Sequence, residues 1–518
     1  MMIAKLVQKH EKKFNRFLEI IPGALTWTLI TAPIWLGILA PSIIVYLLTF
    51  MAVYWTYLAI KHTVGMIVGY KRYVNELKID WLFECKKLDF AKLPEKETIP
   101  ASLNEIKHFL LIPAVNESKD VLAESIDSIL NQTYPINKIT LVYTVEEKSA
   151  PPVIQGIHEL LGEKENLFDR VLIYTHPAGI PGEAIGAGAA NRTWGAKHAV
   201  KHLLSFGENP RNYIFSTIDA DHVLHKQYLA RLTHLYLSSD KRDNRFYSTA
   251  VHLFNNNHWQ VPTMMRIEAN AITLGGISDW ATSKPTLKDT FSAYSASLKT
   301  LMDIDYWDVS LGVDDTIFYW RAFFKRDGDF VGTPHCIPYS ADAVEGETYL
   351  KSYISLYKQL LRWGWGVMAV PIAMKGFLIN KKVPLFAKMS WVFRHLERSV
   401  LLINVVFLIT FGFAILTAVN PNVKQTNFAY SLPGTMSFIL TLTLILLIPG
   451  TILRFKLASP LPENWPFWKK TLAFLEGPVV ILNLLTYSFF PFVDAQTRML
   501  LGKRSKNLYY TQKVRVNP

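Results

Sequence analysis

Two aspartates, Asp219 and Asp221, follow directly on a strand-like run at 213–218. The carboxyl ends of strands in a parallel sheet form the edge at which such sheets bind ligands. Two carboxylates there offer hard oxygen ligands to Mg²⁺ or Mn²⁺. The alternative is that both aspartates cap a helix, which we expect to begin near Leu224. Two further D-x-D patterns stand in turn-like surroundings, where we expect solvated side chains: Asp303/Asp305 and Asp327/Asp329. Position therefore favours 219/221 as the metal site.

A second acidic pair, Asp314 and Asp315, precedes a run with helical spacing at 317–324. Adjacent carboxylates repel each other, which raises the pKa of one of them. A carboxylate with a raised pKa suits a general base that takes a proton from a hydroxyl group. The other interpretation is that both aspartates are exposed caps of the following helix.

Three residues that bind phosphate or sugar groups well, Gln359, Arg362 and Trp363, are spaced i, i+3, i+4. A helix displays such residues on one face. The forked guanidinium matches a pyrophosphate, and the indole offers a platform for a sugar ring. The alternative is an amphipathic helix at a membrane surface, with the tryptophan as anchor and the arginine reaching the headgroups.

Short apolar runs alternate with helical segments between 108 and about 247, which predicts a mostly parallel sheet covered on both faces. The expected strands are His108–Val115, Ile139–Val145, Val171–Thr175 and Tyr213–Ile218, with a helix over Ser118–Gln132.

Polar residues follow these strands. Asn116 and Glu117 end the first strand, and Glu146 and Glu147 follow the second, so we expect all four at the same sheet edge as Asp219. A small-residue loop at 186–191 opens a helix and would allow the backbone to approach a phosphate or sugar.

The chain of 518 residues is 50% hydrophobic, and its mean hydropathy is +0.16. The stretches 21–60, 399–423 and 427–453 contain no charged residue. Because a membrane helix needs about 20 apolar residues, the first stretch fits two spans that are broken near Pro41. Buried core helices are the alternative, but they rarely run this long without a charged face. A signal peptide is disfavoured because the run begins late and is too long. A further candidate at 477–493 either spans or is re-entrant.

The net charge of the chain is +13, and basic residues gather at the ends of the apolar runs. This distribution predicts attraction to anionic lipids rather than nucleic acid binding, with both flanks of the first hairpin in the cytoplasm. The two cysteines, Cys85 and Cys336, are far apart, which suggests neither a disulfide framework nor a metal cluster and fits a cytoplasmic catalytic portion.

Taken in order, these motifs resemble those of the family-2 glycosyltransferases, in the membrane-bound branch that includes cellulose, hyaluronan and chitin synthases and ceramide glucosyltransferases. That branch has an acidic pair after the second strand, a D-x-D, a later acidic pair and Q-x-x-R-W. The matching residues here are Glu146/Glu147, Asp219/Asp221, Asp314/Asp315 and Gln359/Arg362/Trp363. Three departures are Glu-Glu in place of Asp-Asp, Val313-Asp314-Asp315 in place of T-E-D, and Gly186 in place of a lysine, for which Arg192 is a candidate substitute.

The resemblance implies a GT-A type nucleotide-sugar-binding domain of the α/β class, with a mixed, mostly parallel sheet and flanking transmembrane helices. It also implies roles for individual residues. Asp219 and Asp221 would bind the metal and the donor diphosphate, Asp315 would be the general base beside Asp314, and Trp363 would contact the acceptor. The donor-binding residues implied are Asn116, Glu117, Glu146, Glu147, Asn191, Gln359 and Arg362.

The domain organisation predicted from these features runs through six segments: a transmembrane hairpin (1–71), a charged linker (72–107), the catalytic domain (108–366), an amphipathic interfacial segment (367–398), a C-terminal transmembrane region (399–493) and a basic tail (494–518). We expect an integral protein of the cell membrane that transfers sugar from a UDP-sugar, with inversion, to a growing polysaccharide. The alternatives are transfer of one sugar to a lipid acceptor and, more remotely, a transporter with a cytoplasmic regulatory domain.

Overall fold

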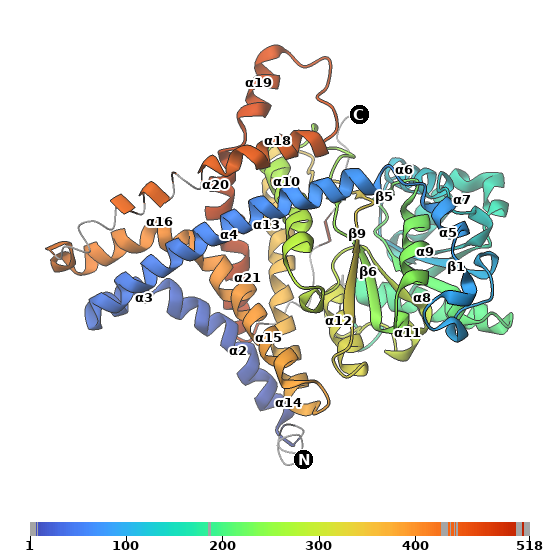
Figure 1. Cartoon of the computed structure of the whole chain (residues 1–518), viewed down its shortest axis with the longest axis horizontal. Helices are drawn as coiled ribbons and strands as arrows, with labels where there is room; N and C mark the ends of the chain where they lie inside the picture. The colour runs from blue at the N-terminus through green and yellow to red at the C-terminus, as the bar shows by residue number, and fades with distance from the viewer. Residues whose placement is uncertain are drawn as a thin grey trace. The chain divides into compact units, whose positions relative to one another are not determined.

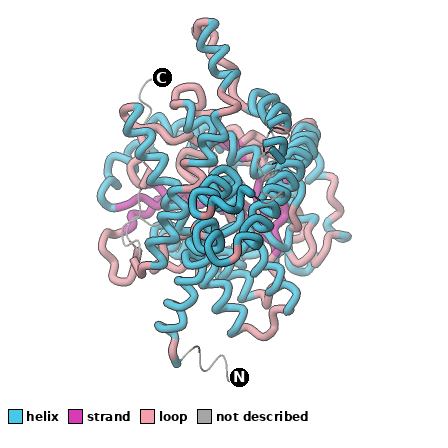
Figure 2. The backbone as a smooth tube through the Cα atoms, turned by 90° about the vertical axis from the view of Figure 1, so that its left-hand side faces the viewer, coloured by secondary structure: helices cyan, strands magenta, loops and turns pink. Residues whose placement is uncertain are grey.

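In the computed structural model the chain forms two compact units, each assembled from separate stretches of sequence. Unit 1 comprises Met1–Val68, Arg266–Thr282 and Leu356–Arg504, and unit 2 comprises Gly69–Met265, Ser283–Ser355 and Ser505–Pro518. The structure describes all residues except 1–6, 8, 185–187, 426–433, 436, 440, 442–443, 504–509 and 512–518. The ten described strands all belong to unit 2, whereas the described part of unit 1 contains only helices and connecting segments. Figure 2 shows the helices in cyan and the strands in magenta.

A seven-stranded sheet forms the centre of unit 2, and strands β1, β6 and β9 are labelled in Figure 1. Its order is β3-β2-β1-β4-β8-β6-β9, and β8 alone runs antiparallel to its neighbours. The strands are β1 (Lys107–Ala114), β2 (Ile139–Glu146), β3 (Arg170–His176), β4 (Tyr213–Thr217), β6 (Arg245–Thr249), β8 (Tyr294–Ser297) and β9 (Val331–His335). The predicted α/β class with a mixed, mostly parallel sheet is therefore confirmed, and the four expected strands are all present.

Helices cover both faces of this sheet, which explains why β1 and β2 are apolar along nearly their whole length. Leu110 and Ile112 of β1 face a core shared with helices α6 (Lys119–Leu130), α7 (Ala150–Leu161) and α9 (Tyr228–Ser238). On the other face, Phe109 packs on Phe215 of β4, with ring centroids 6.2 Å apart. Because successive side chains of a strand point to opposite faces of the sheet, β1 contributes to the hydrophobic core on each face.

Helix α8 (Gly188–Ser205) packs closely against strand β2. A Cβ atom at Gly195 would overlap the side chain of Thr144 on β2, so only glycine permits this approach. The close packing fixes the first turn of α8, which carries Asn191 and Arg192, beside the carboxyl edge of the sheet.

A second, three-stranded sheet follows the carboxyl edge of the first. Its order is β5 (Val223–Leu224), β10 (Tyr339–Ser340) and β7 (His252–Leu253). Residues 223 and 224 pair antiparallel with β10 instead of opening a helix, so the helix expected near Leu224 begins at Tyr228 as α9. This pairing places the segment after Asp221 in a β conformation.

The segment predicted as a charged linker, 72–107, contributes to the core of unit 2. Helix α4 (Pro41–Glu76) ends in it and α5 (Trp81–Lys86) follows. Trp81 is buried, and the Arg231 guanidinium lies 3.8 Å from the centre of its ring. Arg231 also pairs with Glu76 at 3.0 Å. These contacts anchor the segment to α9.

The described residues include three helices that are long and apolar enough to cross a membrane: Pro41–Glu76, Leu385–Val419 and Val479–Leu500. The first continues from unit 1 into unit 2 at Gly69. The pair α2 (Glu11–Ile30) and α3 (Ala32–Leu39), bent by 61°, would be a fourth span if it counts as one. Large apolar side chains on these helices face outward, among them Leu39 at 76% exposure. An exposed apolar surface of this kind is typical of contact with lipid.

The apolar stretch 21–60, predicted as two spans broken near Pro41, is broken at Thr31 as well as before Pro41, where α4 begins. The Thr31 hydroxyl donates to the Trp27 carbonyl (2.7 Å), and Pro33 lacks an N–H for the helix ladder. Helices α2 and α3 therefore stand in place of the one helix that was expected before Pro41.

Later parts of unit 1 also differ in detail from the sequence prediction. The segment 367–398 forms α14 (Ala369–Ile379) and α15 (Leu385–Leu396), and α15 continues through a π turn at Glu397–Leu401 into α16 (Leu402–Val419). The span expected at 427–453 lies partly outside the described residues. Helix α10 (Thr263–Thr282) was expected within the catalytic domain, but from Arg266 onward it belongs to unit 1.

Candidate active site

The segment that follows strand β4 carries a group of three residues that can hold a metal ion: Asp219, Asp221 and His222. One ligand atom from each lies within 4.8 Å of the others. Asp221 and His222 are each 2% exposed, whereas the Asp219 side chain is 43% exposed. Two carboxylates and an imidazole fit a divalent cation, and the nitrogen ligand favours Mn²⁺ over Mg²⁺. His222 is a residue that the sequence reasoning missed.

The small sheet holds this acidic group in place. The Asp342 backbone N–H, just beyond β10, donates to Asp221 Oδ2 at 2.9 Å. The imidazole of His222 stacks on the ring of Tyr339 in β10, with centroids 4.2 Å apart and planes at 29°. The carboxylate and the imidazole are thus oriented by neighbouring groups of the protein.

Asp314 and Asp315 occupy the first turn of helix α12 (Asp314–Lys325), where the helix dipole favours negative charge. Their environments differ. Asp314 Oδ2 pairs with the guanidinium of Arg192. Asp315 Oδ2 accepts a hydrogen bond from the Ser292 N–H at 3.0 Å. Ser292 has a left-handed φ of 52°, an unusual conformation for a residue other than glycine.

Arg192 connects the two acidic groups. Its Nε donates to Thr217 Oγ1 of β4 at 2.9 Å, and its second terminal nitrogen donates to Asp219 Oδ1 at 2.7 Å. Because its remaining nitrogen pairs with Asp314, one side chain bridges the end of β4 and the start of α12.

The acidic pair Glu146 and Glu147, at the end of β2, contacts residues at the end of β3 and in the loop that follows it. Asn191 of α8 donates to Glu146 at 2.9 Å, and the Ala178 N–H donates to Glu147 at 2.8 Å. His176 lies between two carboxylates, with Nδ1 at 3.1 Å from Glu146 and Nε2 at 3.0 Å from Glu183. The small-residue loop at 186–191 is described only from Gly188 onward.

The two carboxylates determine the charge of His176. Burial alone would lower the pKa of the imidazole, but the hydrogen bonds and charges of Glu146 and Glu183 outweigh burial and raise it. Trp194 of α8 meets the ring edge-on and adds no charge. His176 is therefore an imidazolium over a wider pH range than a free histidine.

We expect His176→Gln to lower the melting temperature more at about pH 6 than at about pH 9. Because the folded pKa is raised, the stabilisation is complete below the unfolded pKa and is lost as the pH rises through the folded pKa. Thermal melts of both proteins across this range measure the difference. His108→Gln is the control of opposite sign, because burial lowers the pKa of His108 to about 3. Only the unfolded chain is protonated there near pH 6, so removal of His108 should lower the melting temperature less at about pH 6 than at about pH 9. A His176 effect that grows with pH would contradict the assignment.

Glu117 is partly buried beside the C-terminal segment of unit 2. The Tyr510 hydroxyl donates to it at 2.7 Å, and the Val115 N–H donates at the same distance. Burial raises the pKa of the Glu117 carboxyl despite these two hydrogen bonds. The pKa of Tyr510 is also raised, by burial and by the charges of Glu117, Asp221 and Asp219. Tyr510 therefore adds a hydroxyl group to the acidic site, which the sequence reasoning did not identify.

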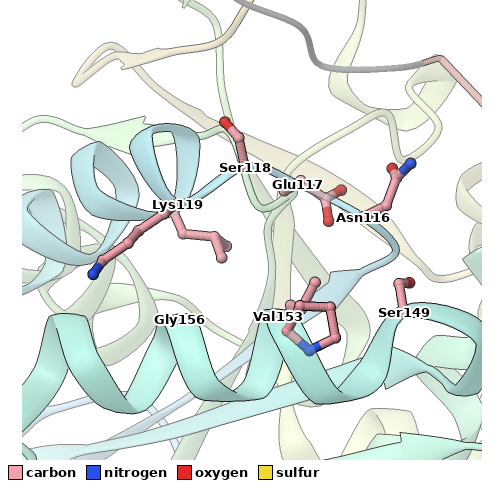
Figure 3. Close-up of a pocket in the computed structure, with 9 residues that line it drawn as sticks. Asn116, Glu117, Ser118, Lys119, Ser149, Val153 and Gly156 are labelled. Atoms are coloured by element: carbon pink, nitrogen blue, oxygen red, sulfur yellow. The ribbon is translucent and has the colours of Figure 1, made fainter.

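A pocket of about 330 Å³ opens between the start of α6 and the first turns of α7 (Figure 3). Its lining residues are Asn116, Glu117, Ser118, Lys119, Leu122, Ser149, Pro152, Val153 and Gly156. The predicted donor-binding residues Asn116 and Glu117 thus border this cavity, which apolar residues such as Leu122 and Val153 also line.

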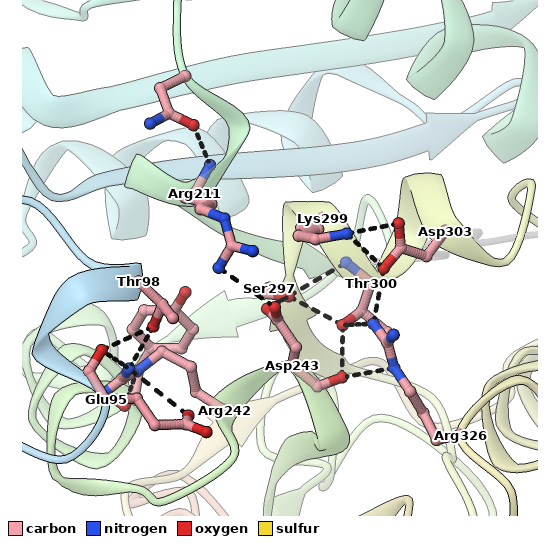
Figure 4. A network of polar contacts seen from close by, with 12 residues as sticks. Glu95, Thr98, Arg211, Arg242, Asp243, Ser297, Lys299, Thr300, Asp303 and Arg326 are labelled. Atoms are coloured by element: carbon pink, nitrogen blue, oxygen red, sulfur yellow. Dashed lines mark hydrogen bonds and ion pairs between the residues drawn. The ribbon is translucent and has the colours of Figure 1, made fainter.

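The other two D-x-D patterns have structural partners. Asp303 accepts from Lys299 (2.7 Å) and Arg326 (2.8 Å), as Figure 4 shows. Asp329 pairs with Lys241 at 2.9 Å. Only Asp305 matches the expected solvated state closely, since its side chain is 75% exposed.

Gln359, Arg362 and Trp363 lie on helix α13 (Tyr349–Gly364), at the spacing predicted for one face. They belong to unit 1, whereas the acidic residues belong to unit 2. At the end of α13, a Cβ on Gly364 would crowd Ala495 of α21 (Phe490–Leu500), so glycine allows these two helices to approach.

No protein-family model and no curated protein matches the sequence. Solved structures match at low identity. The mannosyltransferase PcManGT from Pyrobaculum calidifontis, in complex with GDP-Man and Mn²⁺, is 14% identical, with a TM-score of 0.41, and the match covers 85% of this chain and 99% of that one. S. aureus TarS 1-349 in complex with UDP is 12% identical, with a TM-score of 0.32 and coverages of 64% and 92%. At these scores the likenesses do not by themselves assign an activity.

Proposed function

We propose that this protein is a membrane-embedded glycosyltransferase that uses a nucleoside-diphosphate sugar and a divalent cation. The observation that carries the proposal is the group Asp219, Asp221 and His222 at the carboxyl end of the central strand β4. Asp314, from the start of α12, reaches the same group through Arg192. A mostly parallel sheet with cation ligands and a second acidic pair at one edge supports a GT-A type domain.

Asp219, Asp221 and His222 are the residues that would hold Mg²⁺ or Mn²⁺. Bound there, such an ion supplies charge neutralisation for a departing nucleoside diphosphate. Asn116, Glu117 and the pocket they border would receive another part of the donor. Glu146, Glu147 and Asn191 complete the donor side. The bond from Asn191 to Glu146 and the bond from the Ala178 N–H to Glu147 would set the shape of that side.

Asp315 is the residue that we assign as general base. Asp314 is neutralised by Arg192, whereas Asp315 Oδ2 accepts a hydrogen bond from the backbone N–H of Ser292. The acceptor oxygen would form a bond to the anomeric carbon as its proton passes to Asp315. The bond between that carbon and the phosphate oxygen breaks, and its electron pair leaves with the nucleoside diphosphate. A single in-line displacement inverts the anomeric carbon.

Gln359, Arg362 and Trp363 would contact the donor pyrophosphate and the acceptor sugar. Their support is the shared face of α13 together with the chemistry of a forked guanidinium and an indole platform. The long apolar helices of unit 1 support placement in a bilayer, which we propose is the cell membrane, with unit 2 in the cytoplasm.

For the product we propose a growing polysaccharide, with addition of one sugar to a lipid as the second candidate. The Q-x-x-R-W motif and apolar helices on both sides of the catalytic sequence favour the polymer. The small number of candidate spans, three or four among the described helices, favours the lipid. Labelled nucleotide sugars supplied to the purified protein should yield long polymer. Products that carry one sugar only would overturn the polymer assignment and support the second candidate.

A further inference from the structure

Arg192 is buried within the acidic site, and each of its three guanidinium nitrogens has a partner. Nε donates to Thr217, and the two terminal nitrogens donate to Asp219 and Asp314. The side chain is only 7% exposed. A planar fork held at three points is rigid, so it fixes the position of both carboxylates.

The start of helix α8 is adapted to this arrangement. A Cβ atom at Gly188 would overlap both Arg192 and the Asp314 carboxylate. Glycine at 188 therefore leaves the space in which the arginine meets the aspartate. The contact depends on residues from three separate elements, α8, β4 and α12, which is more than a chance surface pair provides.

The fixed positive charge has a direct consequence for cation binding. Arg192 lies 2.7 Å from Asp219 Oδ1, so it competes with a divalent cation for that oxygen. It also offsets the mutual repulsion of Asp219, Asp221 and Asp314, which would otherwise crowd one half-buried region. Removing the positive charge would leave a more negative and more strongly cation-binding site.

We infer that Arg192 is a resident counter-ion that weakens divalent-cation binding at Asp219 while it holds Asp219 and Asp314 in their working positions. The inference rests on the proposed function and makes Arg192 a positioning residue. If Arg192 had a structural role alone, substituting it would lower both the affinity for the cation and the turnover. A counter-ion role makes the two quantities move in opposite directions.

The test is Mn²⁺ binding by the purified full-length protein, measured by electron paramagnetic resonance of the free ion without donor. We expect Arg192→Gln to bind Mn²⁺ at least about tenfold more tightly than wild type, while turnover falls at least about tenfold. Arg192→Lys keeps the charge but cannot bridge both aspartates, so its Mn²⁺ affinity should stay within about threefold while turnover still falls.

Arg170→Gln is the matched control, because Arg170 also bridges two carboxylates, Asp169 and Glu208, and should leave Mn²⁺ affinity unchanged. Unchanged or weaker Mn²⁺ binding by folded Arg192→Gln overturns the counter-ion role even if wild type binds the ion. If Arg192→Gln does not fold, an Arg192→Lys affinity that differs from wild type by much more than threefold overturns it instead. Failure of wild type to bind Mn²⁺ overturns the proposed metal site and this inference together.

Discussion

Asparagine in place of Asp221 is expected to abolish turnover while unit 2 remains folded. The Asp221 carboxylate is 2% exposed, and its Oδ2 accepts the Asp342 N–H at 2.9 Å. Asparagine keeps the shape and an oxygen acceptor for that N–H but removes the negative charge. Stabilisation of a departing diphosphate by a bound cation is worth several kcal/mol, so we expect kcat to fall by about 10³ or more. Initial rates at saturating Mn²⁺, together with a thermal melt, measure both parts of the expectation.

Asp329→Asn is the matched control for this substitution. Asp329 also ends a D-x-D, but its carboxylate pairs with Lys241 and Arg245 instead of facing another acidic ligand. We expect its kcat to equal that of wild type. Wild-type turnover in folded Asp221→Asn, or an equal loss in Asp329→Asn, would mean that the cation group has been assigned to the wrong residues.

The second large effect is expected at Asp315. Asparagine cannot accept the acceptor's proton, and loss of a general base costs about 10² to 10⁴ in rate. The amide oxygen still accepts the Ser292 N–H, so the start of α12 should keep its conformation. We therefore expect kcat to fall by this factor and the donor KM to change little, as measured by initial rates over a range of donor concentrations.

The neighbouring carboxylate provides an internal comparison. In Asp314→Asn the amide oxygen still accepts from Arg192, and no proton transfer is assigned to this residue. We expect its kcat to stay within about tenfold of wild type, the scale of one weakened charged hydrogen bond. The reverse ranking, with Asp314→Asn the slower enzyme, would exchange the roles of the two aspartates.

Sequence reasoning predicted the parallel half of the fold because its strands are buried on both faces. A strand such as β1 is then a continuous apolar run, and its end fixes where the following polar residues lie. This is why the sheet edge that carries Asn116, Glu146 and Asp219 could be predicted. The reversed direction of β8 could not be predicted, because Tyr294–Ser297 is short and pairs with strands far away in sequence.

The parts of the site that were missed depend on long-range pairing. Strands β5 and β10 have two residues each, too few for any periodic signal, yet their pairing places Tyr339 against His222. Tyr510 reaches Glu117 across 393 positions of sequence. The one available signal for His222 was its place directly after Asp221, since an imidazole beside two carboxylates is itself a metal ligand.

The division of the chain into units was also beyond sequence reasoning. The residues of helix α10 lie within the predicted catalytic domain, 108–366, but from Arg266 they belong to unit 1. Gly65 on α4 explains the packing, because a Cβ there would overlap Ser278 of α10. Which helices pack together depends on the shapes of their facing side chains. Hydrophobic periodicity shows which side of a helix is buried, but it does not show which helix lies against that side.

The most direct test of the central claim is release of nucleoside diphosphate from a panel of nucleotide sugars by the purified wild-type protein. Release is measured first in EDTA and then after addition of Mn²⁺ in excess. We predict that at least one donor releases its nucleoside diphosphate only when Mn²⁺ is present, with one sugar transferred to acceptor for each diphosphate. The claim is contradicted if no donor is turned over with Mn²⁺ and an acceptor present, or if release proceeds equally fast in EDTA.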